Sequence, residues 1–145
     1  MQSELESLSE QCLEEEDEAR LQALFARADA AFRRVEPSLG ARFSQAYFDC
    51  RGFHDAYMTR IDLGEALQLD LLLRDGRAVS LRLEGVSSLR IWGDLASGCY
   101  PPARGGERTI AQVLWVWFDE GLECCVQLDS GRRLLARAKA CRLDG

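Results

Sequence analysis

Apolar side chains recur at helical spacing in the first part of the chain. The stripe contains Leu21, Leu24, Phe25, Ala28, Ala31, Phe32 and Val35. This i, i+3, i+4, i+7 pattern is typical of an amphipathic helix with one buried face. We therefore predict a helix over residues 3–35, with a possible interruption at the acidic run 14–18. Pro37 is expected to end it, because the residue before a proline avoids the helical region, and Ser38 is expected to cap a short helix through Ala46.

After Phe53 the period of the apolar positions changes from about 3.6 residues to 2 residues, which predicts strands. A first strand contains Ala56, Met58 and Ile61, a second runs over residues 67–73, a third over 79–84 and a fourth over 86–93. Asp75-Gly76 between the second and third strands predicts a tight hairpin, since both residues tolerate the positive φ angles of a type I′ turn.

The second half of the chain continues the strand pattern after a Gly- and Pro-containing loop at residues 97–107. Residues 110–118 are apolar on both faces, and two further strands are expected at 122–128 and 132–143. The fold class is therefore α+β: a long acidic N-terminal helix (1–36) packed on a six- to seven-stranded, mostly antiparallel meander sheet (53–143). Residues 1–145 are expected to form a single domain.

Charge is distributed unevenly along the chain. Residues 1–36 contain ten acidic and four basic residues, which equals the net charge of −6 for the whole protein. The negative charge concentrated in residues 1–36 repels nucleic acid and anionic membranes, and it attracts a basic protein surface. The N-terminus shows no signal-peptide pattern and no apolar run has membrane-spanning length, so we expect a cytoplasmic protein with six reduced, mostly buried cysteines.

Two groups of residues are candidates for partner binding. The first is the acidic run, in which like charges at i and i+4 repel one another, so a solvated helix face and a docking surface are equally good interpretations. It consists of Glu14, Glu15, Glu16, Asp17 and Glu18. The second is Trp115 and Trp117, which share one face of a strand; that face is covered by the predicted helix or by a partner.

The chain offers few residues for catalysis or metal binding. His54 is the only histidine. In a strand Asp55 would point to the opposite face, and a hydrogen bond from His54 to a loop carbonyl is the simpler interpretation. The Cys50/His54 spacing lacks the second pair of ligands that a closed zinc site needs. No nucleophile or phosphate-binding motif is present, so we predict no enzyme, no metal and no cofactor.

The sheet region resembles a known group of proteins. Phe53-His54-Asp55-Ala56, the hairpin, residues 81–86 (LRLEGV) and Leu89-Arg90-Ile91 resemble small bacterial proteins that include immunity proteins of polymorphic toxin systems. The resemblance covers residues 53–143; Glu84 stands where an aromatic residue is common. The resemblance implies a protein that binds and neutralises a cognate toxin, and the acidic N-terminal region independently favours a basic toxin domain as partner. The alternatives are a homodimeric structural or adaptor protein pairing through Trp115 and Trp117, and a small enzyme centred on His54.

Overall fold

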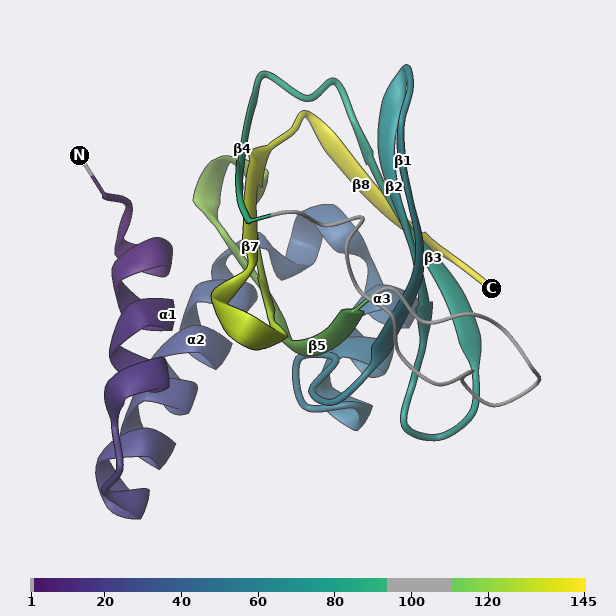
Figure 1. Ribbon diagram of the computed structural model, residues 1–145. Coiled ribbons are helices and arrows are strands. Elements are labelled where there is room, and N and C mark those ends of the chain that lie inside the picture. Colours follow the sequence, from purple (N-terminus) through teal and green to yellow (C-terminus); the bar gives the residue numbers. More distant parts are fainter. Residues whose placement is uncertain (1, 94–110) are drawn as a thin grey trace.

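A computed structural model describes residues 2–93 and 111–145 of the chain (Figure 1). The expected loop at 97–107 lies outside the described residues. The described part contains three helices on an antiparallel sheet, which confirms the α+β class. None of its helices combines the length and the apolar character needed to cross a membrane.

The predicted N-terminal helix is interrupted at the acidic run, as the sequence suggested. Helix α1 (Glu4–Glu14) begins after Ser3, whose hydroxyl accepts a hydrogen bond from the Glu6 N–H at 3.1 Å. Helix α2 (Glu18–Leu39) begins after Asp17, whose carboxylate accepts from the Arg20 N–H at 3.0 Å. Side-chain oxygens at N-caps satisfy amide groups that the helix itself leaves unpaired, so the run 14–18 contains one helix end and one helix start.

The prediction that Pro37 ends the helix is wrong, because α2 continues to Leu39. Val35 is buried and Leu39 packs against the core one turn later, so tertiary packing favours the extra turn. Helix α3 (Ala41–Asp49) begins after Gly40 instead of Ser38, without a side-chain cap. Gly40 has a φ of +89°, which turns the chain between the two helices.

The sheet has eight strands instead of the six or seven expected. They are β1 (Tyr57–Leu63), β2 (Ala66–Leu72), β3 (Ala78–Glu84), β4 (Ser88–Trp92), β5 (Ala111–Asp119), β6 (Glu123–Leu128), β7 (Arg133–Arg137) and β8 (Ala140–Asp144). The extra strand arises because the predicted strand 132–143 is divided into β7 and β8. Short 3₁₀ turns, Glu120–Leu122 and Asp129–Gly131, join β5 to β6 and β6 to β7.

The strand order is β4-β7-β6-β5-β1-β2-β3-β8, and every pairing is antiparallel. Two meanders, β1-β2-β3 and β5-β6-β7, follow the predicted order. The pairs β5-β1, β4-β7 and β3-β8 connect strands that are distant in sequence. The fold is therefore two meanders joined side by side.

The sheet bends sharply where β3 leads into β4 and β7 leads into β8. Glu84 pairs with Ala140 and Ser88 pairs with Arg137. Between them the Lys139 N–H donates to the Glu84 carbonyl and the Ser87 N–H to the Arg137 carbonyl, both at 2.9 Å. The β3–β4 and β7–β8 segments thus bend together and remain hydrogen-bonded to each other. Figure 1 shows the β4-β7 half facing the half that contains β1, β2 and β8.

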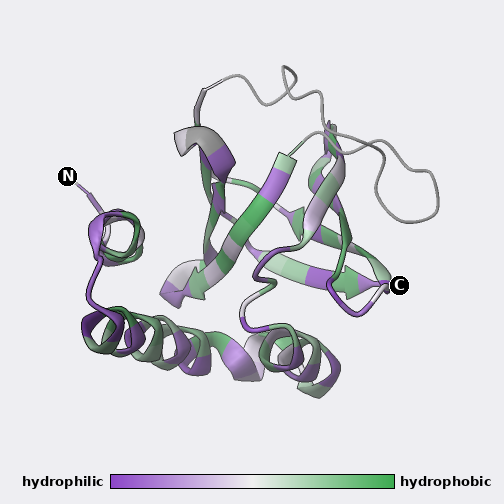
Figure 2. Cartoon of the chain, turned by 60° about the horizontal axis from the view of Figure 1, so that its bottom comes forward, coloured by the Kyte–Doolittle hydropathy of each residue, from purple (hydrophilic) through white to green (hydrophobic). Residues whose placement is uncertain are grey.

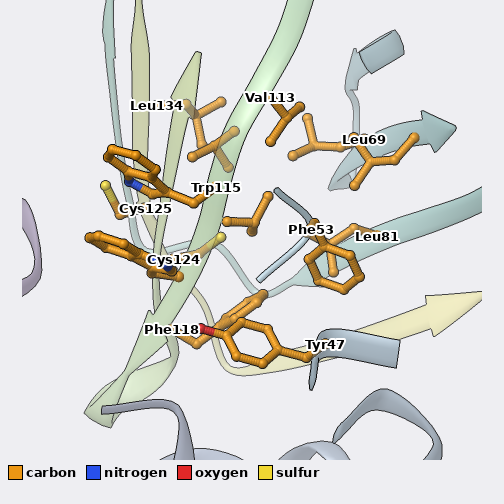
Figure 3. Close-up of a cluster of buried hydrophobic side chains, with 14 of the residues drawn as sticks. Tyr47, Phe53, Leu69, Leu81, Val113, Trp115, Phe118, Cys124, Cys125 and Leu134 are labelled. Atoms are coloured by element: carbon orange, nitrogen blue, oxygen red, sulfur yellow. The ribbon is translucent and has the colours of Figure 1, made fainter. Parts of the chain in front are cut away.

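The hydrophobic core lies between the two halves of the bent sheet and beneath the helices. Leu69 and Leu81 from one half meet Val113 and Leu134 from the other, with Phe53 beside them (Figure 3). The helices lie along one side of the sheet, and α1 turns its polar side outward (Figure 2). This arrangement confirms that helices cover one face of the sheet.

The Asp75-Gly76 hairpin joins β2 to β3 as predicted, but it is not a type I′ turn. Of its residues only Gly76 has a positive φ, +91°. The Gly76 N–H donates to the Leu73 carbonyl at 3.0 Å, and the Leu73 N–H donates to the Arg77 carbonyl at 2.8 Å. These bonds define a three-residue loop with a glycine bulge, the next most common hairpin class.

Candidate functional site

A cleft of about 660 Å³ lies between α2, the α3–β1 connection and β5. Four of the nine predicted site residues meet there. Its lining residues are Glu18, Leu21, Gln22, Phe25, Asp29, Phe48, Arg51, His54, Leu114, Trp115 and Trp117. Glu18, His54, Trp115 and Trp117 were predicted from the sequence. The rest of the acidic run and Asp55 lie outside the lining.

One wall of the cleft is a stripe along α2. Glu18, Leu21, Gln22, Phe25 and Asp29 are spaced at three or four residues, so they share one side of the helix. The apolar pattern of this segment predicts the helix but not which polar residues border its buried stripe. Asp29 and Phe25 were therefore missed as site residues, although their spacing from Glu18 was the available signal.

The floor of the cleft is an aromatic cluster. Trp115 and Trp117 stack with ring centroids 4.7 Å apart and planes 10° from parallel, and Phe25 meets both edge-on. The Trp115 side chain is 6% exposed and that of Trp117 is 3% exposed, because α1 and α2 cover this face of β5. The helices thus occupy the face on which the homodimer alternative depended.

The opposite wall is an unusual backbone segment between α3 and β1. Arg51, Gly52, Phe53 and Asp55 all have positive φ values, between 51° and 70°. Such conformations are rare for residues other than glycine and are maintained by surrounding structure. Here the Val116 N–H donates to the Gly52 carbonyl at 2.8 Å, so the segment is fixed against β5.

His54 belongs to this segment, and its side chain also bonds to β5. Its Nδ1 lies 2.7 Å from the Leu114 carbonyl, so Nδ1 carries the proton and donates it. Its Nε2 lies 3.4 Å from an Asp55 carboxylate oxygen. The expectation that these neighbours would point apart is wrong, because residues 51–55 form a turn and not a strand.

The interactions of Asp55 extend away from the cleft. Gln112 donates to the Asp55 carboxylate at 3.3 Å, and Arg74 lies 3.9 Å from it. Within the described residues, no serine, threonine or cysteine side chain bonds to His54. His54 and Asp55 therefore brace the α3–β1 connection against β5.

The acidic residues of the N-terminus form two groups. Glu6 is 4% exposed and lies 3.0 Å from Arg90 and 3.6 Å from Arg133; Glu10 lies 3.1 Å from Arg133. This network fixes α1 to β4 and β7. The sequence did not predict that Glu6 is buried, since acidic residues are rarely inside unless paired.

The acidic run 14–18 occupies the α1–α2 connection, and in the described structure none of its carboxylates forms an ion pair. Three of them make local hydrogen bonds: Glu15 accepts from the Asp17 N–H, Asp17 caps α2, and Glu18 accepts from Gln22 at 2.9 Å. Glu14 and Glu16 are exposed and make no side-chain bond there. We call this exposed connection, residues 14–18, the acidic tip.

Asp29 is the other carboxylate of the cleft. Asp29 is exposed, yet neighbouring protein atoms remove part of the water around its carboxyl and raise its pKa above the ordinary value, while the nearby charge of Arg33 opposes this shift. Arg33 itself lies 3.7 Å from Glu36 and 4.5 Å above the Phe48 ring. Asp29 therefore has no ion pair and no hydrogen bond within the described part of the chain.

The described cysteines lie inside the protein. Cys12, Cys50, Cys124, Cys125 and Cys141 are free and buried, as predicted; Cys99 lies outside the described residues. Cys50 contacts Arg77 at 3.8 Å. In residues 2–93 and 111–145 no group of three or more His, Cys, Asp or Glu side chains is arranged to hold a metal ion.

Comparison with known proteins adds no relative. The chain matches no protein-family model, and a search of curated proteins finds none similar to it.

Proposed function

We propose that the protein is a non-catalytic binding protein that docks a basic protein partner on its acidic tip. The observation that carries this proposal is the group of carboxylates at residues 14–18, all exposed except the half-buried Glu15, which lacks ion pairs within the described structure. Carboxylates that stabilise the fold have cationic neighbours here, as Glu6 and Glu10 do. Glu14 and Glu16 make no such contact, so their charge is available to a partner.

The class of partner follows from charge and from the resemblance of residues 53–143 to immunity proteins. We propose a cognate bacterial toxin that acts on nucleic acid in the cytoplasm. The surface of such a toxin is basic, and carboxylates can occupy the positions where phosphates would bind. Complementary charge raises the association rate more than the affinity, because it steers the diffusing partners together.

The test screens the genes beside the one that encodes this chain for a basic toxin domain and measures the association of that domain with the chain by stopped flow. The variant is E14K/E16K, because these side chains make no bond in the described structure, while Glu15, Asp17 and Glu18 accept hydrogen bonds. Lysine near the C-terminus of α1 also suits the helix dipole, so folding should be preserved. We expect association to slow by roughly tenfold or more at low salt, with a flatter salt dependence.

The matched control is D49K/E65K, which changes the net charge equally at exposed positions, the last residue of α3 and the β1–β2 turn, whose side chains make no bond in the described structure. Its association rate should stay closer to that of the wild type. Equal slowing by both variants would mean that net charge, and not the acidic tip, attracts the partner. An unchanged rate for E14K/E16K would remove the tip from the interface.

A further inference from the structure

Helix α1 packs tightly on the rest of the protein but is joined to it by a very short connection. Leu5 and Leu8 are buried, and Glu6 lies 3.0 Å from Arg90 and 3.6 Å from Arg133. Only three residues separate α1 from α2. The contacts of α1 are made with residues beyond this connection, so the α1 of a second copy can make the same contacts. This is the condition for an exchange of α1 between two chains.

The connection folds α1 back along α2. The Arg27 guanidinium lies 3.5 Å from the Glu4 carboxylate, so the start of α1 lies beside the middle of α2. Figure 1 shows the connection at the free end of this helical pair, beyond the sheet. Glu15 and Asp17 are extended, with ψ values of 122° and 121°. Two exposed hydrogen bonds hold them so: the Asp17 N–H donates to Glu15 at 3.1 Å, and the Arg20 N–H donates to Asp17 at 3.0 Å.

The sequence of the connection favours a helix instead of a fold-back. Residues 4–36 contain no glycine and no proline, and the run 14–19 (EEEDEA) consists mainly of strong helix formers. A continuous helix through residues 15–17 would gain backbone hydrogen bonds and lose the Asp17 cap and the Glu15 bond. Helices α1 and α2 would then be collinear. In that form α1 would reach the sheet of a second copy and not its own.

Charge opposes this continuous helix. Glu14 and Glu18 would stand at i and i+4, where like charges repel. In an exchanged dimer the two long helices would run antiparallel and cross near Glu16, because Glu4 stands 12 residues before Glu16 and Arg27 stands 11 residues after it. The five carboxylates of one acidic tip would thus lie against the five of the other. Repulsion that disfavours one specific alternative structure is a common way to prevent such exchange.

We propose that α1 can exchange between two copies of this chain through a continuous helix over residues 4–39, and that the acidic tip keeps α1 on its own chain. The partner is a second copy, which would dock on the surface that α1 covers, including Trp115. This exchange is independent of the proposed function, because a tip that prevents it need not bind a toxin. E14K/E16K also removes repelling charge, so its association with a toxin domain is measured at protein concentrations where sedimentation shows a monomer.

The test variant is E15A/D17A, which removes both hydrogen bonds of the connection and two carboxylates, and introduces the strongest helix former. The full chain is refolded from urea at a series of concentrations, so that α1 is free to dock on either chain, and its mass is measured by sedimentation equilibrium. We expect the variant to dimerise with a Kd lower than that of the wild type by roughly tenfold or more.

The matched control is D49A/E65A, which removes two carboxylates at exposed positions whose side chains make no bond in the described structure. It should sediment as the wild type does. If E15A/D17A is as monomeric as the wild type at every concentration, the proposal is wrong. Equal dimerisation of both variants would show that net charge, and not the connection, governs association.

An interchain contact distinguishes exchange from ordinary association. The Trp115 indole nitrogen lies 2.9 Å from the Ser9 hydroxyl, and in the monomer both belong to one chain. Equal amounts of ¹⁵N-labelled and ¹³C-labelled E15A/D17A chains are refolded together. We expect a nuclear Overhauser effect from the Trp115 indole proton of one chain to the Ser9 protons of the other. A dimer without this effect would contradict the exchange of α1.

A proline separates helix continuity from loss of charge. E16P, added to E15A/D17A, removes a third carboxylate but is strongly unfavourable inside a helix. It suits the folded-back form, since position 15 is extended there, as the residue before a proline prefers. The triple variant should therefore be monomeric, and a dimer would contradict the continuous helix.

The wild type tests the role of charge without any substitution. The Debye length falls from about 10 Å at 0.1 M salt to about 3 Å at 1 M, so repulsion between the two tips is screened. Refolding in about 1 M NaCl should raise the dimer fraction of the wild type at high protein concentration. A dimer fraction that does not change with salt would contradict the role given to the carboxylates.

Discussion

Trp115 donates its indole N–H to the hydroxyl of Ser9, 2.9 Å away, and thereby joins β5 to α1. The same hydroxyl donates to the Gln127 side-chain carbonyl at 3.1 Å. Ser9 and Gln127 are completely buried, so both bonds are shielded from water. One serine thus connects α1 to the neighbouring strands β5 and β6 and keeps α1 packed over Trp115 and Trp117.

Replacement of this serine, S9A, should destabilise the protein. It leaves the Trp115 N–H without its acceptor and the Gln127 carbonyl without its donor, and an unpaired buried polar group costs about 1–3 kcal/mol. Urea unfolding followed by circular dichroism measures the change. S7A, at a partly exposed position of the same helix, should stay within about 0.5 kcal/mol of the wild type. Equal stability of the two variants would show that the buried bonds contribute nothing.

The left-handed segment between α3 and β1 predicts a second sensitive position. Gly52 has a φ of +70°, and an added Cβ would lie 3.4 Å from both the Tyr47 hydroxyl and the Trp117 indole nitrogen. G52A should therefore cost about 1–2 kcal/mol, chiefly from the backbone conformation. G64A provides the control, because Gly64 lacks a positive φ and has open space around it. Thermal unfolding of both variants should show a clear loss only for G52A.

Much of the fold could be predicted because the signals were local. The stripe from Leu21 to Val35 and the alternation in residues 67–73 reflect the periods of helix and strand directly. The interruption at the acidic run was predictable from charge repulsion. Pro37 was misleading, because its local preference was outweighed by the packing of Leu39.

The candidate site was less predictable, because it depends on contacts between distant segments. Trp115 and His54 were identified by residue type, and the N-terminal helix was predicted as a cover for Trp115, but nothing in the sequence placed His54 beside α2. Arg51, Phe53 and Asp55 adopt positive φ values although none of them is a glycine, and Gly52 is the one residue of the segment whose type favours that conformation. The division of the last predicted strand was equally hidden, since the bend at Lys139 is set by its pairing with Glu84.

The buried thiols should be unreactive in the folded protein. Burial raises the pKa of Cys12 to about 11 and those of Cys125 and Cys141 to about 12, and the thiolate is the reactive form. A C99S variant restricts the measurement to described positions. At about pH 8 its thiols should react with Ellman's reagent slowly in buffer and rapidly in denaturant. Rapid labelling of the native variant would contradict the buried positions.

The carboxylate of Asp29 should make stability depend on pH in a specific direction. Its pKa in the folded protein lies above the ordinary value of 3.8. The native state therefore holds this proton more tightly than the unfolded state does, and the contribution of Asp29 to stability falls as pH rises through the window above 3.8.

The D29N variant removes this titration, so its stability relative to wild type should increase as the pH rises above 3.8 and then level off. Urea unfolding at a series of pH values measures the difference. E65Q corrects for the loss of one negative charge from an acidic protein. A D29N difference that falls with pH would contradict the raised pKa. A rise would identify Asp29 as a carboxylate whose ionisation lowers the stability of the protein at neutral pH.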